Sequence, residues 1–163
     1  MATRRELLKW SMGAAAAFSA GLPLGLARAE GGALALVVAK ASPIQQLSQF
    51  ELKKLYLGSH IVDPRGERII AFNQAPNSQD RTAFEQRVLG MSPEEVARYW
   101  IDRKIRGEGG APKAVGSVEL LQRVVSKMEH SVAYVRVDQV RPELRIVAID
   151  GAVPGDPAYR LFA

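Results

Sequence analysis

The sequence contains no cysteine and only two histidines, and both shortages limit the chemistry open to the chain. Without cysteine there is neither a disulfide framework nor a thiolate metal site. His60 and His130 are far apart in the sequence and have no carboxylate at ligand spacing. We therefore expect two surface histidines and no metal site.

Motifs of catalysis and nucleotide binding are also missing. No Gly-x-Ser-x-Gly elbow occurs, and a serine nucleophile would need a histidine to activate it. The loop 107–112 (GEGGAP) is rich in glycine, but Lys113 is followed by Ala114, whereas a phosphate-binding loop ends in lysine and then serine or threonine. Basic residues between positions 98 and 113 alternate with acidic ones, which is typical of a solvated helix face. We expect no enzyme activity, no cofactor and no nucleic-acid partner.

The N-terminal residues carry the features of an export signal. Arg4 and Arg5 precede a weakly apolar stretch that ends at 27–29 (ARA), a small-x-small pattern that suits signal peptidase. This predicts a twin-arginine signal at 1–29, export to the periplasm, and a mature domain at 30–163. Glycines and a proline interrupt the apolar stretch, so we expect cleavage and no membrane span afterwards; a short anchor that stays attached is the alternative. Cleavage would lower the net charge from +5 to about +2.

The mature region begins with a strand pattern and a well-marked helix. Residues 33–39 (ALALVVA) are continuously apolar, as expected for a strand covered on both faces. Ser48 is placed to cap a helix, and Glu51 is its capping-box partner three residues later. Gly58 is placed to end that helix in a left-handed turn.

The rest of the chain alternates strand and helix patterns. Strands are expected at 69–72, 132–137 and 144–149, and helices are expected to begin at Ser78, Ser92 and Ser117. For the helix after Ser92 we expect a buried apolar stripe made of Val96, Ala97, Trp100, Ile101 and Ile105. The pattern predicts one α/β domain with a mixed or mostly parallel central sheet of about four strands, flanked by about four helices.

Phe84 and six short segments follow one another in an informative order. The segments are 37–43 (VVAKASP), 47–58 (LSQFELKKLYLG), 88–90 (VLG), 99–100 (YW), 107–112 (GEGGAP) and 132–135 (VAYV). In this order they resemble the substrate-binding proteins of phosphate ABC transporters, over roughly residues 34–161, and specifically a half-length group with one of the two lobes. The resemblance implies a single periplasmic-binding-protein-like lobe. Full-length members close two lobes around an oxyanion, using amides and hydroxyls at helix N-termini.

The resemblance also implies a ligand site before the helix at Ser78. Ser78 matches a serine of the family's site. Gln74 stands where the family has an arginine, Pro76 stands where it has an aspartate, and residues 79–80 (QD) replace glycine and threonine. The bidentate contact that the family's arginine makes with an oxyanion is therefore missing from position 74.

Two further residues complete the expected site. Arg81, in the first turn of the helix, can substitute for the missing arginine if its side chain bends back, whereas the carboxylate of Asp80 opposes an anion there. Ser42 offers a polar group at the carboxyl end of the first strand, where ligands of open α/β sheets bind. The expected ligand-binding residues are thus Ser42, Gln74, Ser78 and Arg81. Ordinary roles as a helix cap, a loop hydroxyl and a surface charge are the alternatives.

Two functions from different classes follow from these patterns. The first is an exported binding protein for phosphate or a similar oxyanion, whose cleft is completed by a second copy or by another polypeptide. The second is a ligand-free interaction or sensing module that keeps the lobe's fold and docks to an envelope protein.

Overall fold

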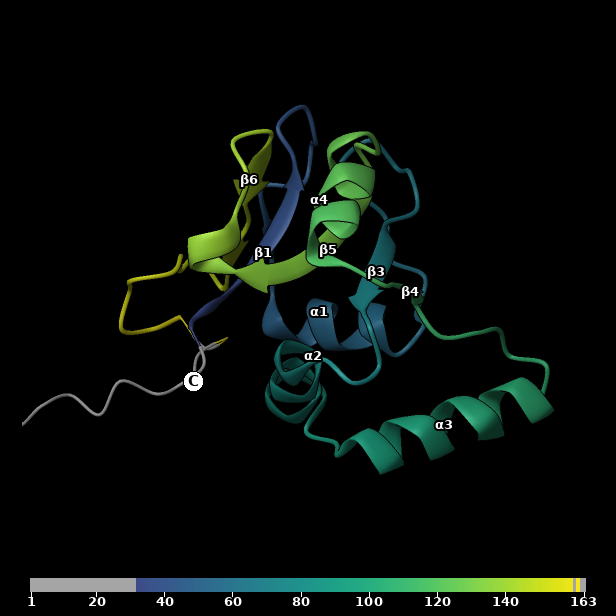
Figure 1. The fold of residues 1–163 in the computed structure, drawn as a ribbon. Helices are drawn as coiled ribbons and strands as arrows, with labels where there is room; N and C mark the ends of the chain where they lie inside the picture. Colours follow the sequence, from purple (N-terminus) through teal and green to yellow (C-terminus); the bar gives the residue numbers. More distant parts are fainter. Residues whose placement is uncertain (1–31, 160, 162–163) are drawn as a thin grey trace, which may run out of the picture.

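A central β-sheet with helices on both faces forms the body of the protein (Figure 1). The computed structural model describes residues 32–159 and 161. The predicted export signal at 1–29 lies outside the described residues. The strands are β1 (Leu34–Ala39), β2 (Gln46–Leu47), β3 (Ile70–Gln74), β4 (Lys113–Val115), β5 (Ser131–Arg136), β6 (Leu144–Ile146) and β7 (Ala148–Ile149). The helices are α1 (Gln49–Tyr56), α2 (Gln79–Phe84), the π-helix η1 (Glu85–Leu89), α3 (Pro93–Ile105), α4 (Val118–Ser126) and the short 3-10 helix η2 (Val137–Gln139).

The main sheet has five strands in the order β4-β3-β5-β1-β6. β3 pairs in parallel with β4 and β5, whereas β1 is antiparallel to both of its neighbours, β5 and β6. β2 and β7 form a separate parallel pair. The predicted α/β fold with a mixed central sheet is confirmed, with one strand more than expected, because the short strand β4 follows the glycine-rich loop.

β1 lies at the centre of the protein and is buried on both faces, as its apolar run predicts. Leu34, Leu36 and Val38 belong to a core cluster shared with α1 and with the α2–η1 segment. Ala35 and Val37 point the other way, into a cluster shared with α4. The alternation of strand side chains therefore builds two apolar layers, one on each face of the sheet.

The helix starts predicted from serine caps are confirmed. Ser48 and Glu51 form a reciprocal capping box at α1, and Ser92 and Glu95 form another at α3. Ser117 caps α4 by accepting the Leu120 amide. These caps satisfy amide groups that have no partner within the helix, so their spacing can be recognised without tertiary information.

Three expectations need correction. The strand expected at 144–149 is divided into β6 and β7, which join different sheets. The helix expected from Ser78 to Gly90 changes from an α-helix to a π-helix at Glu85, and the wider turns bury Glu85 beside Val88 and Leu89.

The third correction concerns α3. No helix among the described residues is long and apolar enough to cross a membrane. In α3, however, most of the apolar residues are exposed to solvent. Ile101 and Ile105 are 60% and 80% exposed, Ala97 is exposed and Trp100 is only partly buried. Val96 alone of the predicted stripe is buried. The prediction of a buried stripe is therefore wrong for most of its members, because α3 lies beyond the edge of the sheet (Figure 1).

Candidate functional site

Three of the four predicted ligand-binding residues meet at the carboxyl end of β3. Gln74, the last residue of the strand, is buried, and its side-chain amide donates to the Tyr134 carbonyl of β5 at 3.1 Å. Its side-chain oxygen accepts a hydrogen bond from the Ser78 hydroxyl at 2.7 Å. Ser78 in turn caps α2 by accepting the Arg81 amide. Strand end, cap and first helical turn are thus joined by side-chain hydrogen bonds.

Arg81 does bend back toward the loop, but it meets a carboxylate there. Its Nη1 donates to the Gln74 carbonyl at 3.1 Å, and its Nε lies 2.7 Å from Oε1 of Glu85. The Glu85 side chain is 3% exposed and the Arg81 side chain 15%. A buried carboxylate is tolerated only when it is paired and hydrogen-bonded, so Glu85 depends on Arg81. The positive charge expected to attract an anion is therefore already neutralised within the protein.

A cluster of three aromatic side chains packs next to this network. Tyr56, Phe84 and Tyr134 contact one another, with the Phe84 and Tyr134 rings stacked at 3.9 Å between centroids. The Tyr134 hydroxyl donates to the Asn73 side chain, and burial raises the pKa of Tyr134 well above its ordinary value. Tyr134 is therefore a neutral hydrogen-bonding group at any physiological pH.

The helix end retains groups that suit an anion. In the part of the chain that the structure describes, the amides of Gln79 and Asp80 donate no hydrogen bond, as is usual in a first helical turn. These amides and the Ser78 hydroxyl form the polar surface at the start of α2. The Asp80 carboxylate in the same turn already occupies the positive end of the helix dipole.

Ser42, the fourth predicted residue, lies beyond the carboxyl end of β1, at the opposite end of the sheet's strands from Gln74. β1 is antiparallel to β5, and β5 is parallel to β3, so the carboxyl ends of β1 and β3 point in opposite directions. The Ser42 hydroxyl accepts the Ile44 amide, and its carbonyl accepts a hydrogen bond from Arg145. The structure therefore does not bring Ser42 together with Gln74, Ser78 and Arg81.

Sequence reasoning did not identify Glu85, Asn73 and Tyr134. The four-residue spacing of Arg81 and Glu85 is a signal for an ion pair on a helix and could have been used to find Glu85. Tyr134 offers no such signal, because it is sixty positions away from Gln74 within an apolar strand pattern.

The two histidines differ from each other. His60 is exposed, as expected, whereas His130 is partly buried and its Nδ1 lies 2.6 Å from Oδ2 of the buried Asp63. The expectation of a surface residue is therefore wrong for His130. Among residues 32–159 and 161, no group of three or more histidine and carboxylate side chains is arranged to hold a metal ion.

Comparisons with known proteins identify the fold. No protein-family model and no curated protein matches the chain. Among solved structures, the ABC-type phosphate transport receptor from Vibrio cholerae is 21% identical, with a TM-score of 0.63 over 80% of this chain and 53% of the receptor. The putative phosphate ABC transporter substrate-binding protein with bound phosphate from Clostridium perfringens is 20% identical, with a TM-score of 0.58 over 74% of this chain and 46% of that protein. PstS from Borrelia burgdorferi is 18% identical, with a TM-score of 0.57 over 76% of this chain and 49% of PstS.

The chain spans about half the length of the structures it matches. It therefore has the fold of one lobe of a periplasmic-binding-protein-like structure, as the order of its sequence motifs predicts. At these identities the likeness defines the fold, while the ligand has to be argued from the residues of the site.

Proposed function

We propose that this protein is an exported substrate-binding lobe that recognises a small oxyanion, with phosphate as the candidate ligand. The observation that carries the proposal is the convergence of Gln74, Ser78 and Arg81 at the start of α2, on a fold similar to that of the phosphate transport receptor from Vibrio cholerae. The Clostridium perfringens protein of the same fold is described with bound phosphate. Helix starts favour anions because amides without a partner and the helix dipole both point at the ligand.

The site has two internal competitors for an anion. Glu85 already accepts a hydrogen bond from Arg81, and Asp80 adds a second carboxylate in the first helical turn. The first-turn amides of Gln79 and Asp80 remain the principal donors, because the Ser78 hydroxyl already donates to the Gln74 side-chain oxygen and would have to turn away from it to reach the ligand. One lobe also leaves the ligand open to water on one side, which screens these contacts. We expect the isolated chain to bind phosphate weakly, with Kd near or above ~0.1 to 1 mM.

A second copy of the chain or another polypeptide would complete the cleft. Delivery of the ligand to a transporter would be the corresponding role, since two of the structural neighbours are described as components of phosphate ABC transport. The twin-arginine pattern at Arg4 and Arg5 supports a periplasmic location for this role. Replacing Arg4 and Arg5 by lysine should leave unprocessed chain in the cytoplasm; normal export and processing of that variant would contradict the proposed route.

Isothermal titration calorimetry with phosphate and sulfate tests the site. Arg81→Ala is a poor variant, because it would leave Glu85 buried without a partner and destabilise the fold. Glu85→Gln keeps a side-chain oxygen for the Arg81 Nε and removes the competing charge. We expect it to tighten phosphate binding by about tenfold, which corresponds to about 1.4 kcal/mol.

Two further variants separate the contributions. Ser78→Ala should weaken binding, and the double variant Arg81→Gln with Glu85→Gln should lose the gain seen in Glu85→Gln alone. Arg123→Gln, on the exposed side of α4, is the control and should change nothing. Micromolar binding by a proven monomer would refute the expectation that one lobe binds phosphate weakly. If none of the three site variants changed the affinity, the proposed location of the site would be wrong.

The second candidate is a ligand-free interaction module, and one observation favours it. The closed Arg81–Glu85 pair makes the network at β3 self-sufficient, so it can serve structure alone. In that case neither the native chain nor Glu85→Gln would bind phosphate or sulfate, and α3 with its exposed Ile101 and Ile105 would be the surface to examine for an envelope partner.

A further inference from the structure

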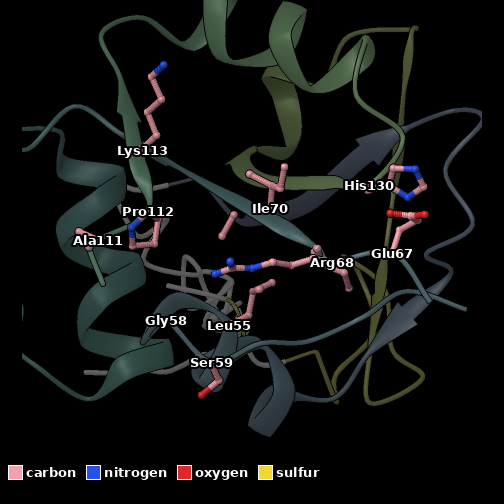
Figure 2. A pocket seen from close by; sticks show the side chains of 13 residues that line it. Leu55, Gly58, Ser59, Glu67, Arg68, Ile70, Ala111, Pro112, Lys113 and His130 are labelled. Carbon is pink, nitrogen blue, oxygen red and sulfur yellow. The ribbon is translucent and has the colours of Figure 1, made fainter. Parts of the chain in front are cut away.

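A pocket of about 490 Å³ lies at the amino end of β3, at the opposite end of that strand from Gln74 (Figure 2). Its wall comes from the end of α1, the segment 67–71 and the loop 110–112 before β4. Pockets of about 300 to 1,000 Å³ with a mostly apolar lining and a few polar groups are typical of small-molecule sites. Neither the predicted ligand-binding residues nor the α2 network takes part in this pocket.

Arg68 is the central polar group of the pocket. Figure 2 shows its side chain lying across the cavity between Leu55 and Ile70, with the guanidinium directed toward Ala111 and Pro112. Among the described residues, Arg68 forms no hydrogen bond through its side chain and no ion pair, and it is exposed to solvent. It thus differs from Arg81, whose charge is neutralised by Glu85. A guanidinium without an acceptor, set on apolar side chains, is arranged to bind a carboxylate by two parallel hydrogen bonds.

The backbone of Arg68 is held by a clamped hairpin. Arg68 forms an antiparallel bridge with Val62, and Asp63 closes the turn between them by accepting the Arg65 and Glu67 amides at 2.8 and 3.0 Å. The other carboxylate oxygen of Asp63 lies 2.6 Å from Nδ1 of His130. Burial alone would raise the pKa of Asp63, but the hydrogen bonds from His130 and from the Glu67 and Arg65 amides outweigh it and hold the pKa below its ordinary value. Asp63 therefore stays ionised and keeps the turn closed, which fixes the position of the Arg68 backbone at the pocket.

The charges around the pocket define which anion it suits. Lys113 also lines the wall, but in Figure 2 its ammonium is directed away from the Arg68 guanidinium. Glu67 and His130 lie at the other end of the pocket, on the side of the Arg68 backbone. One cation thus faces the cavity, and Glu67 repels additional negative charge. A group with a single negative charge is compensated there, whereas the second charge of a phosphate is not.

We propose that this pocket binds a small monocarboxylate with an apolar body, whose carboxylate pairs with the Arg68 guanidinium while its body lies on Leu55, Ile70 and Pro112. The site is separate from the oxyanion site at Ser78 and does not depend on it.

The test is a two-dimensional ¹H–¹⁵N NMR titration of the purified chain with hexanoate and with benzoate. We expect amide shifts centred on Arg68, Ile70 and Ala111. Arg68→Gln should weaken binding of both probes at least tenfold, and Arg68→Lys, which keeps the charge but loses the planar fork, should weaken it less. Lys113→Gln is the matched control and should leave the affinity within twofold. Because Arg68 is exposed, a thermal melt of each variant should match that of the native chain.

Two further probes, one uncharged and one multiply charged, test the preference for a single negative charge. Hexanol should bind far more weakly than hexanoate, and phosphate should not compete with hexanoate at these amides. The proposal is overturned if neither carboxylate binds, if Arg68→Gln binds them as the native chain does, if the shifts lie at Ser78, or if phosphate binds the pocket more tightly than the carboxylates. Ser78→Ala should not alter hexanoate binding, so failure of the oxyanion site and failure of this pocket can be told apart.

Discussion

α3 and α4 begin in the same way but lie in different surroundings. Each starts at a serine cap, and each carries apolar residues at helical spacing. α4 packs on the face of the sheet and buries Leu121 and Val125 completely. α3 contacts η1 and the segment after α1, where Tyr99 and Arg103 donate to the Leu57 carbonyl. It leaves Ile101 and Ile105 exposed. The difference teaches that caps and periodicity determine whether a helix forms, whereas its place in the topology determines what its apolar face meets.

Chain connectivity explains why α4 is buried. α4 joins the parallel strands β4 and β5 and so crosses the sheet over β3. α3 precedes β4, which is an edge strand of the main sheet, and the loop 106–112 joins the two. Because the sheet ends at β4, α3 extends past the strands that the structure describes (Figure 1).

The largest effect on stability is expected when a buried side chain of α4 is shortened. Leu121→Ala should lower the free energy of unfolding by about 3 kcal/mol, because the side chain is fully buried and its removal leaves a cavity. Leu120→Ala, one position away and 47% exposed, is the matched control and should cost less than about 1 kcal/mol. Urea unfolding measures both. Equal losses would contradict the assignment of the buried face.

Trp100→Ala tests how firmly α3 is anchored. The ring lies against Gly58, where a Cβ atom would come within 2.9 Å of it, and it contacts Tyr99 edge-on. Since the indole is only partly buried, we expect a loss of about 1 to 2 kcal/mol, below the 3 to 5 kcal/mol usual for a buried tryptophan. A loss above about 3 kcal/mol in urea unfolding would show that α3 is integrated in the core like α4.

Cap removal should separate local from global stability. Ser92→Ala and Ser117→Ala each delete a helix cap that is worth about 1 kcal/mol. For α4 the loss should appear in global unfolding, because the helix is part of the core. For α3 it should appear chiefly as faster hydrogen exchange of the amides in Pro93–Ile105. Identical responses of the two helices would show that α3 and α4 are anchored to the protein equally firmly.

The smallest effect is expected at the far end of α3. Ile105→Ser should change the free energy of unfolding by less than about 0.5 kcal/mol, because the side chain is 80% exposed. The measurement should be repeated at two protein concentrations. A loss that grows with concentration would show that Ile105 is covered in a self-associated form.

The secondary structure could be predicted from the sequence where it depends on contacts between residues close together in the chain. Ser48 with Glu51 and Ser92 with Glu95 are contacts within four residues, so their spacing carries the information. The direction of β1 was not readable, because a strand's own pattern is the same in either orientation and its partners lie far along the chain. The division of 144–149 has the same cause, since only tertiary pairing assigns β6 and β7 to different sheets.

The site was predictable only in part. Gln74, Ser78 and Arg81 lie within eight positions, and a strand followed by a capped helix brings such residues together. Ser42 could be placed only by knowing that β1 runs against β3. The role of Arg81 depends on the buried carboxylate of Glu85, whose inward position follows from the π-helical turn at Glu85–Leu89. That turn has no simple sequence pattern, and π-helical turns often occur at functional sites.

The position of β1 also governs the order of events during folding. β1 is the first of the described strands to be synthesised, whereas its partners β5 and β6 come much later, since Leu34 pairs with Arg136 roughly a hundred positions on. The backbone of β1 has no strand partner on either side until β5 and β6 have emerged from the ribosome. Loss of β5 and β6 would therefore leave an apolar strand without partners and prone to aggregate, and assembly of the sheet around β1 requires both of them. The central part of the sheet can therefore form only after residues 131–146 have been synthesised.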